Sequence, residues 1–222
     1  MNNKLEIDSV ILKFGTETVL QDIYLKIETG KITGLLGRNG SGKTCLMNII
    51  YGNLKAQEKT LRLDNKYISS KYLPISSLTY LPQFSFIPKH LTIERIFKDY
   101  KDDFNDFIVY FPEIKKYYKT KFTTLSGGEQ RIIEVYLILV SKTKFCMLDE
   151  PFSQIMPIHI ESIKKLILRE KEKKGLLITD HLYEHIIDLC DDIYIIKNRK
   201  IHLTKSIEDI HQLGYIFKKN ME

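Results

Sequence analysis

The stretch Gly37-Arg38-Asn39-Gly40-Ser41-Gly42-Lys43-Thr44 follows the apolar run Ile32–Leu36 and leads into the helix-forming run Thr44–Tyr51. It fits the phosphate-loop pattern GxxxxGK[ST], which acquires meaning when it follows a strand and opens a helix. In such a loop the backbone N–H groups wrap phosphates, the lysine reaches the β- and γ-phosphates, and the Thr44 hydroxyl ligates Mg²⁺. The predicted phosphate-binding residues are Gly37, Asn39, Gly40, Ser41, Gly42, Lys43, Thr44 and Cys45.

A second stretch, Phe145–Leu148, is an apolar strand that ends in two carboxylates, Asp149 and Glu150. Ligands of open α/β sheets bind at the carboxyl ends of strands. We therefore expect Asp149 to hold Mg²⁺ through water and Glu150 to orient the water that attacks a γ-phosphate. The alternative is an Asp-Glu pair that only caps the turn at Pro151.

Between these two stretches, residues 125–130 read LSGGEQ. The adjacent glycines let the backbone approach an anion, Ser126 offers a hydroxyl, and the apolar run Ile132–Val140 can continue as a helix whose N-terminus faces that anion. Ser126, Gly127 and Gly128 are thus predicted to bind phosphate. One nucleotide would then have two binding elements in the same chain.

Three further residues are candidates for contacts with the nucleotide. His181 ends a buried strand and can contact the γ-phosphate, although a polar loop residue would look the same. Gln83 follows the strand Leu78–Leu81 and Pro82, from where it can reach Mg²⁺ or the attacking water. Phe14, placed in a loop between two predicted strands, can stack on adenine or pack in the core.

Composition limits the class of protein. The chain has 222 residues, 43% hydrophobic and 28% charged, which suits one globular domain with subdomains. The longest apolar run, Ile132–Val140, is interrupted by Glu134 and is far below the roughly 20 residues of a membrane span. Met1–Lys13 lacks the features of a secretion signal, so we expect a cytoplasmic protein.

Cysteine spacing and net charge give less information about function than the motifs do. Cys45, Cys146 and Cys190 lie far apart without CxxC or Cys/His spacing, so neither a disulfide framework nor a zinc site is expected. The net charge of +6 suits nucleic acid or a membrane leaflet as a partner, but also a solvated lysine-rich surface. The basic segment Lys115–Lys119 is open to the same two interpretations.

Hydrophobic periodicity predicts strands alternating with helices in the C-terminal half, which specifies a parallel sheet. Short β-like pieces at Leu61–Leu63 and Tyr67–Ser69 predict a small antiparallel layer. The predicted strands are Lys4–Lys13, Thr18–Ile27, Ile32–Leu36, Ser77–Leu81, Lys144–Leu148, Gly175–Thr179, Asp192–Lys197 and an edge strand Ile201–Thr204. The predicted helices are Thr44–Tyr51, one opening at Leu91–Glu94 with Thr92 as its cap, Asp102–Tyr110, Glu113–Tyr118, Glu129–Ser141, His159–Glu172, Tyr183–Leu189 and Ser206–Leu213.

In this order the motifs resemble the ATP-binding cassette (ABC) family of ATPases over essentially the whole chain. The aromatic residue Phe14, the phosphate loop, Gln83, the LSGGEQ signature, Asp149, Glu150 and His181 match the family in sequence order. The resemblance implies an α/β P-loop NTPase (RecA-like) core with an N-terminal antiparallel β subdomain. It also implies a short helical subdomain at residues 84–124 within one domain, residues 1–222.

The family resemblance further implies how the two phosphate elements are used. Family members form head-to-tail dimers around two ATP, in which Ser126, Gly127 and Gly128 would act on the nucleotide of the other subunit. ATP, Mg²⁺, a homodimer or paired cassette, and a separate transmembrane permease at the cytoplasmic face of the membrane are the implied ligands and partners. No direct nucleic-acid contact is expected.

The motif details are most similar to the lipopolysaccharide-export and branched-chain amino-acid cassettes. Two features depart from the family pattern. Met156 stands where the D-loop, Ser153–Met156, usually ends in Asp, which would weaken communication between subunits or lower turnover. The segment from Gln83 to Ser126 is also short, so the helical subdomain is trimmed.

Other functions stay open at this point. A soluble ABC ATPase acting on nucleic acid or the ribosome is the main alternative, although most such proteins have tandem cassettes or a long coiled coil. A degenerate regulatory nucleotide binder is a third, raised by Met156 and opposed by Glu150 and His181.

Overall fold

A computed structural model describes residues 3–68, 73–74, 77–204 and 206–214. The N-terminal part forms a four-stranded antiparallel sheet in the order β2-β1-β4-β5, as predicted. Its strands are β1 (Lys4–Phe14), β2 (Glu17–Glu28), β4 (Glu58–Leu63) and β5 (Lys66–Tyr67). The prediction that Phe14 lies in a loop was wrong, because Phe14 is the last residue of β1 and pairs with Glu17. Of the predicted piece Tyr67–Ser69, Tyr67 lies in β5 and Ser69 lies outside the described residues.

The second sheet has six strands in the order β10-β9-β3-β8-β7-β6. All neighbours pair in parallel except β10, which runs antiparallel to β9 at the edge, so both predictions are confirmed. The strands are β3 (Ile32–Gly37), β6 (Leu78–Leu81), β7 (Phe145–Asp149), β8 (Gly175–Thr179), β9 (Asp192–Lys197) and β10 (Lys200–Thr204).

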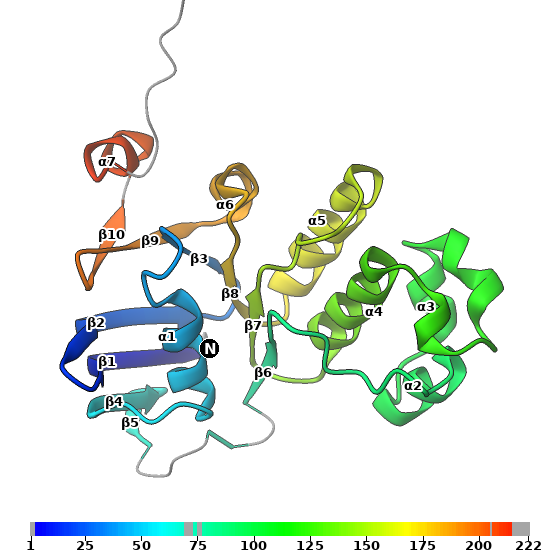
Figure 1. Cartoon of the computed structure of the whole chain (residues 1–222), viewed down its shortest axis with the longest axis horizontal. Helices are drawn as coiled ribbons and strands as arrows, with labels where there is room; N and C mark the ends of the chain where they lie inside the picture. Colours follow the sequence, from blue (N-terminus) through cyan, green and yellow to red (C-terminus); the bar gives the residue numbers. More distant parts are fainter. Residues whose placement is uncertain (1–2, 69–72, 75–76, 205, 215–222) are drawn as a thin grey trace, which may run out of the picture.

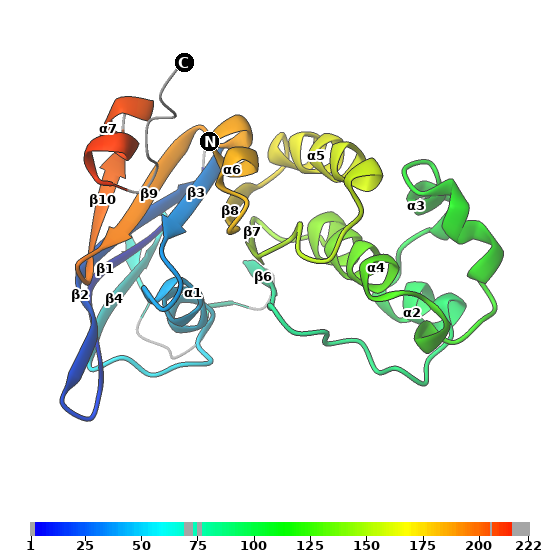
Figure 2. The same ribbon diagram turned by 45° about the horizontal axis from the view of Figure 1, so that its top comes forward.

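Both faces of the parallel sheet are covered (Figures 1 and 2). Helix α1 (Lys43–Tyr51) and the antiparallel sheet lie on one face, and α4 (Gly127–Val140), α5 (Pro157–Lys171) and α6 (Tyr183–Leu189) on the other. Side chains of a strand point alternately to the two faces, so β3 sends Leu35 into one core and Ile32 and Leu36 into the other. This double burial explains the nearly uninterrupted apolar strands. Helix α7 (Ile207–Gln212) follows β10.

Between β6 and α4 the chain forms α2 (Ile93–Tyr100), α3 (Phe104–Ile108) and the 3₁₀ helices η1 (Pro112–Tyr117) and η2 (Phe122–Thr124). The Thr92 cap is confirmed by the Arg95 N–H bond to its hydroxyl, at 3.2 Å. The helix predicted at Asp102–Tyr110 is shorter, because Asp103 caps α3 from inside that range. The short helix predicted at Glu113–Tyr118 is present as the 3₁₀ helix η1, which Pro112 opens.

Aromatic rings attach this helical segment to the rest of the molecule. Phe97 of α2 and Phe107 of α3 both contact Tyr136 of α4, with ring centroids 6.1 and 5.0 Å away. The segment therefore packs on α4, the helix that carries the LSGGEQ motif at its start. Within the described residues, no helix combines the length and the apolar character that a bilayer crossing requires.

Candidate nucleotide-binding site

A cavity of about 450 Å³ opens at the carboxyl ends of the parallel strands. It collects residues from the end of β1, the loop after β3, the start of α1 and the ends of β6, β7 and β8. Most of the predicted site residues therefore meet in one place. The lining residues are Phe14, Val19, Asn39, Gly40, Ser41, Gly42, Lys43, Thr44, Cys45, Gln83, Glu150 and His181.

The phosphate loop has the backbone that its glycines predict. Gly42 has a φ of +100°, and a Cβ there would come within 2.8 Å of the Leu20 side chain, so only glycine fits. The Lys43 ammonium donates a hydrogen bond to the carbonyl of Gly37 at 2.7 Å. Burial lowers the pKa of Lys43, and Glu150 and Asp149 partly offset that effect. An anion in the loop would favour the charged form of Lys43 further.

Asp149 is buried at the end of β7 and does not line the cavity. Its Oδ2 accepts a hydrogen bond from the Tyr80 hydroxyl at 3.1 Å. Its Oδ1 is buried and has no hydrogen-bond partner among the described residues. Burial raises the pKa of Asp149, while the Thr44 and Tyr80 hydroxyls act to lower it. A buried carboxylate oxygen left open beside a threonine hydroxyl fits a hard cation such as Mg²⁺, which prefers oxygen ligands.

Glu150 is held from both sides. The Gln83 side-chain amide donates to Glu150 Oε2 at 2.9 Å, and His181 Nδ1 lies 3.1 Å from Oε1. Glu150 also has a φ of 54°, a left-handed conformation that is uncommon for a residue other than glycine. Two of the predicted catalytic residues, Gln83 and His181, therefore both contact the third, Glu150, at the cavity wall.

The LSGGEQ motif lies elsewhere, since Ser126, Gly127 and Gly128 do not line this cavity. Ser126 caps α4, and its hydroxyl and the Glu129 side chain form a reciprocal capping box. A Cβ on Gly128 would approach the carbonyl oxygen of Gln154 to 2.6 Å, and one on Gly127 would approach the Gln154 side chain to 2.9 Å. Gly128 is thus required by close packing against the D-loop backbone, whereas a Cβ on Gly127 needs only a shift of the Gln154 side chain. The helix N-terminus is exposed to solvent.

Three residues in contact with the site were missed by the sequence prediction. Tyr80 contacts Asp149, Arg131 contacts the backbone of Asp149 and Glu150, and Gln154 packs on Gly127 and Gly128. The signal that points to Arg131 is a pair of charges, Arg131 and Glu134, among the apolar residues of α4, which indicates specific buried partners. No comparable local signal marks Tyr80 or Gln154.

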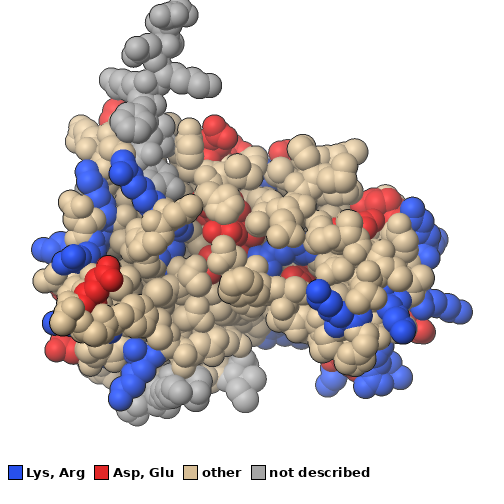
Figure 3. Space-filling view, viewed as in Figure 1, with Lys and Arg blue, Asp and Glu red and all other residues tan. Residues whose placement is uncertain are grey.

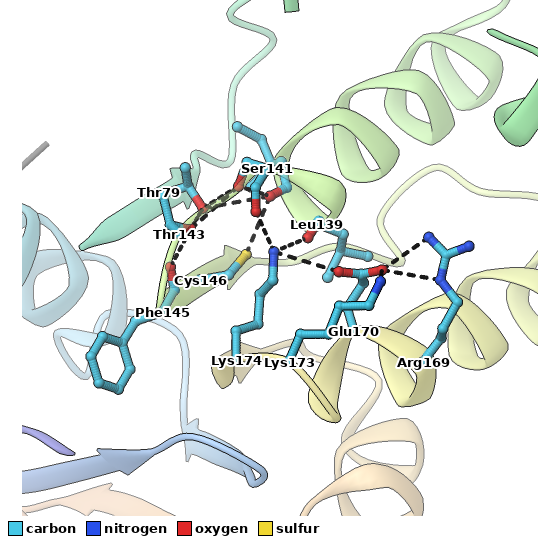
Figure 4. Close-up of polar contacts among 11 residues, drawn as sticks. Thr79, Leu139, Ser141, Thr143, Phe145, Cys146, Arg169, Glu170, Lys173 and Lys174 are labelled. Carbon is cyan, nitrogen blue, oxygen red and sulfur yellow. Dashed lines mark hydrogen bonds and ion pairs between the residues drawn. The ribbon is translucent and has the colours of Figure 1, made fainter. Parts of the chain in front are cut away.

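The far end of α4 is held by a buried lysine (Figure 4). The Lys174 ammonium donates to the carbonyls of Leu139 and Ser141 and lies 3.6 Å from the Glu170 carboxylate. A cation at a helix C-terminus satisfies carbonyls that have no partner within the helix. Helix α4 is therefore fixed to the α5–β8 connection at its C-terminal end.

Comparisons with known proteins agree with this geometry. The family model described as ABC transporter matches residues 20–153. The lipopolysaccharide export ATP-binding protein LptB of Haemophilus influenzae is 30% identical, over 93% of this chain and 92% of its own. The branched-chain amino acid transport ATP-binding protein BraG of Pseudomonas aeruginosa is 28% identical, over 89% of this chain and 90% of its own.

Solved structures show the same fold. The structure of an ATP-binding subunit of an ABC transporter superposes with a TM-score of 0.80 at 18% identity, covering 95% of this chain and 93% of that one. A nucleotide-free ATP-binding cassette gives a TM-score of 0.77 at 21% identity, covering 97% and 96%. The chain therefore belongs to the ABC transporter family, as an ATP-binding subunit that hydrolyses ATP to drive transport.

Proposed function

We propose that two copies of this chain, or this chain and a paired cassette, bind two ATP molecules head to tail and hydrolyse them between the subunits. The observation that carries this proposal is the position of the LSGGEQ turn. It presents an open helix N-terminus to solvent, outside the cavity formed by the phosphate loop. A phosphate held by one chain's loop can meet this turn only on a second subunit.

Within each site, the loop from Gly37 to Thr44 and Cys45 would bind the phosphates, with Lys43 opposite the β- and γ-phosphates. Phe14 is 53% exposed at the cavity rim, which supports stacking on adenine and argues against the core alternative. Thr44, Gln83 and Asp149 would hold Mg²⁺. When bound, this ion would neutralise charge on the phosphates.

Glu150 would orient the attacking water and accept its proton. Its two contacts suggest how the neighbours take part. Gln83 holds one carboxylate oxygen and His181 the other, so a γ-phosphate that attracts Gln83 or His181 would also reposition Glu150. Hydrolysis would in this way be linked to a correctly bound nucleotide.

We further propose that residues 1–222 form a single cassette, with residues 84–124 as its helical subdomain, at the cytoplasmic face of a membrane. Its partner would be a separate permease, which selects the substrate. The relatives are named for lipopolysaccharide export and for branched-chain amino acid transport. On the face shown in Figure 3, lysines and arginines gather mainly at the two ends of the molecule, so this face carries no continuous basic track of the kind that nucleic acid follows.

Glu150→Gln tests the catalytic part of this proposal. Without a carboxylate to accept the proton, we expect ATP turnover to fall by a factor on the order of 100 or more. ATP binding should persist, because the phosphate loop is unchanged. Dimers that appear with ATP and last in the variant should be visible by light scattering after gel filtration. Turnover of the variant at the wild-type rate would remove Glu150 from the mechanism.

A further inference from the structure

Helix α4 contains a buried charged pair. Arg131 and Glu134 are 6% and 1% exposed, and Arg131 Nη1 lies 3.5 Å from Glu134 Oε2. The neighbouring residues Ile132, Ile133 and Val135 are buried and apolar. Buried charges are costly unless hydrogen bonds compensate for the loss of water. The pair must therefore be stabilised by hydrogen bonds to neighbouring groups.

Arg131 spans the ends of two strands. Its Nη1 donates to the carbonyl of Pro82 at 2.8 Å, just after β6. Its Nη2 donates to the carbonyls of Asp149 at 2.6 Å and Glu150 at 3.1 Å, at the end of β7. Two separate nitrogens of the planar guanidinium reach the two strand ends at once, a fork that the single nitrogen of lysine does not offer. Arg131 thus fixes the peptide groups on both sides of Glu150.

Glu134 holds the other side of Gln83. Its Oε1 accepts hydrogen bonds from the Ser85 hydroxyl at 2.6 Å and the Phe86 N–H at 3.1 Å. The segment containing Gln83 is therefore attached to α4 before and after that residue, by Arg131 and by Glu134. Neither charged side chain lines the nucleotide cavity.

The backbone at Glu150 needs such support. A left-handed conformation at a residue other than glycine is strained and persists only where surrounding contacts enforce it. The Glu150 N–H donates to the carbonyl of Thr179 at 2.8 Å, and its own carbonyl accepts from the Ser153 N–H at 3.2 Å. Arg131 adds the contacts that come from α4, the helix that begins at the LSGGEQ turn.

We propose that Arg131, supported by Glu134, is a positioning residue that couples the LSGGEQ helix to the Gln83–Glu150 pair. A shift of α4 when its N-terminus meets a phosphate is passed through the guanidinium to the Glu150 backbone and to the Gln83 segment. Arg131 does not touch the nucleotide and acts only through these groups. The inference rests on the proposed roles of Glu150 and Gln83.

Arg131→Lys tests this coupling. Lysine keeps the charge but cannot contact both strand ends as the two guanidinium nitrogens do. Glu150 and Gln83 should therefore be misplaced while the phosphate loop is intact. We expect kcat to fall roughly 10- to 100-fold and KM for ATP to stay within about twofold. Steady-state ATPase assays, normalised to folded protein, give both numbers. Arg62→Lys is the matched control, because Arg62 also forms ion pairs, with Asp8 and Glu6, but lies in the antiparallel sheet.

Several outcomes overturn the inference. They are wild-type kcat and KM in Arg131→Lys, a lower melting temperature without a change in normalised kcat, or an equal loss of kcat in Arg62→Lys. If Arg131→Lys does not fold, Glu134→Gln decides, because it removes the ion pair at constant shape and should lower kcat at unchanged KM. Glu150→Gln, assayed in parallel, separates the two proposals: its wild-type turnover would remove the catalytic assignment itself.

Discussion

Lys174 is a buried cation at the end of a helix. It is 2% exposed, and burial lowers its pKa even though Glu170 acts to raise it. The charged form is therefore less favourable in the folded chain than in the unfolded one. Its contacts with Leu139, Ser141 and Glu170 lie at the opposite end of α4 from the LSGGEQ turn.

Lys174→Met tests the lowered pKa of Lys174 through the pH dependence of stability. A lowered pKa means that the unfolded chain binds more protons between the folded-state pKa and the ordinary value of 10.5. The wild-type protein should therefore gain stability from Lys174 as the pH rises through that window, and the variant should not. We also expect a loss of about 1–3 kcal/mol at pH 7, because the carbonyls lose their donor.

Urea midpoints of both proteins between pH 7 and about 10.5 check this, since titrations of other groups cancel in the difference. A difference between wild type and variant that does not change with pH would contradict the lowered pKa.

At the residue level, the phosphate-loop and acidic residues could be predicted because their function requires fixed residue types at fixed spacing. Arg131 and Tyr80 follow a different rule. Their partners are distant in the chain: Arg131 bonds Pro82 across 49 positions and Tyr80 bonds Asp149 across 69. Only the packing of α4, β6 and β7 brings these groups together, so no local sequence pattern predicts these contacts.

Among the helices, α5 begins in an unusual way. Met156 is its N-cap residue, its side chain makes no capping hydrogen bond, and Pro157 follows at the first helical position. Methionine has no oxygen to accept from the free N–H groups of the first turn. Met156 is also 64% exposed, so a change there disturbs little else.

Met156→Asp should stabilise the chain. An aspartate at this position can accept the free N–H groups and places a negative charge at the helix N-terminus, which we expect to contribute about 1 kcal/mol. For a chain of this size, that raises the melting temperature by roughly 2–4 °C. Thermal unfolding, monitored by circular dichroism, measures this change in melting temperature. Met156→Asn supplies a cap without charge, and an unchanged melting temperature in both variants would show that α5 does not lack a cap.

The elements also show where sequence periodicity stops being informative. Strands β3, β7 and β8 and helix α4 were predicted because long buried elements need continuous apolar runs. The segment Glu113–Tyr118 has helical character in sequence, yet it turns as a 3₁₀ helix between two aromatic contacts, Phe111 and Tyr118. Such short pieces take their geometry from the core that they cover rather than from their own propensity.

The proposed head-to-tail assembly makes a prediction for the whole molecule. Lys43→Ala damages the phosphate loop, and Gly128→Ala forces a Cβ against the Gln154 carbonyl. We expect each variant alone to have almost no ATPase activity. A mixture should recover part of it, because one of the two sites in a mixed dimer combines an intact loop with an intact LSGGEQ turn.

ATPase assays of the separate and mixed variants measure this recovery. A mixture of Lys43→Ala with Glu150→Gln is the control, because both changes damage the same half of the site and no intact site can form. Recovery in the control, or none in the Lys43→Ala and Gly128→Ala mixture, would rule out a sandwich between two copies of this chain.

Helix α4 is buried at every residue from Arg131 to Leu139, while Ser126 and Gly127 at its start are exposed. Amide hydrogens in such a core exchange with solvent only when the core itself opens, whereas those of an exposed helix start exchange through local fraying. Slow amide exchange at the buried residues and fast exchange at the exposed start are therefore expected within about one turn of the same helix. Deuterium uptake in this segment would therefore report partner binding at the first residues and the global stability of the chain at the residues that follow.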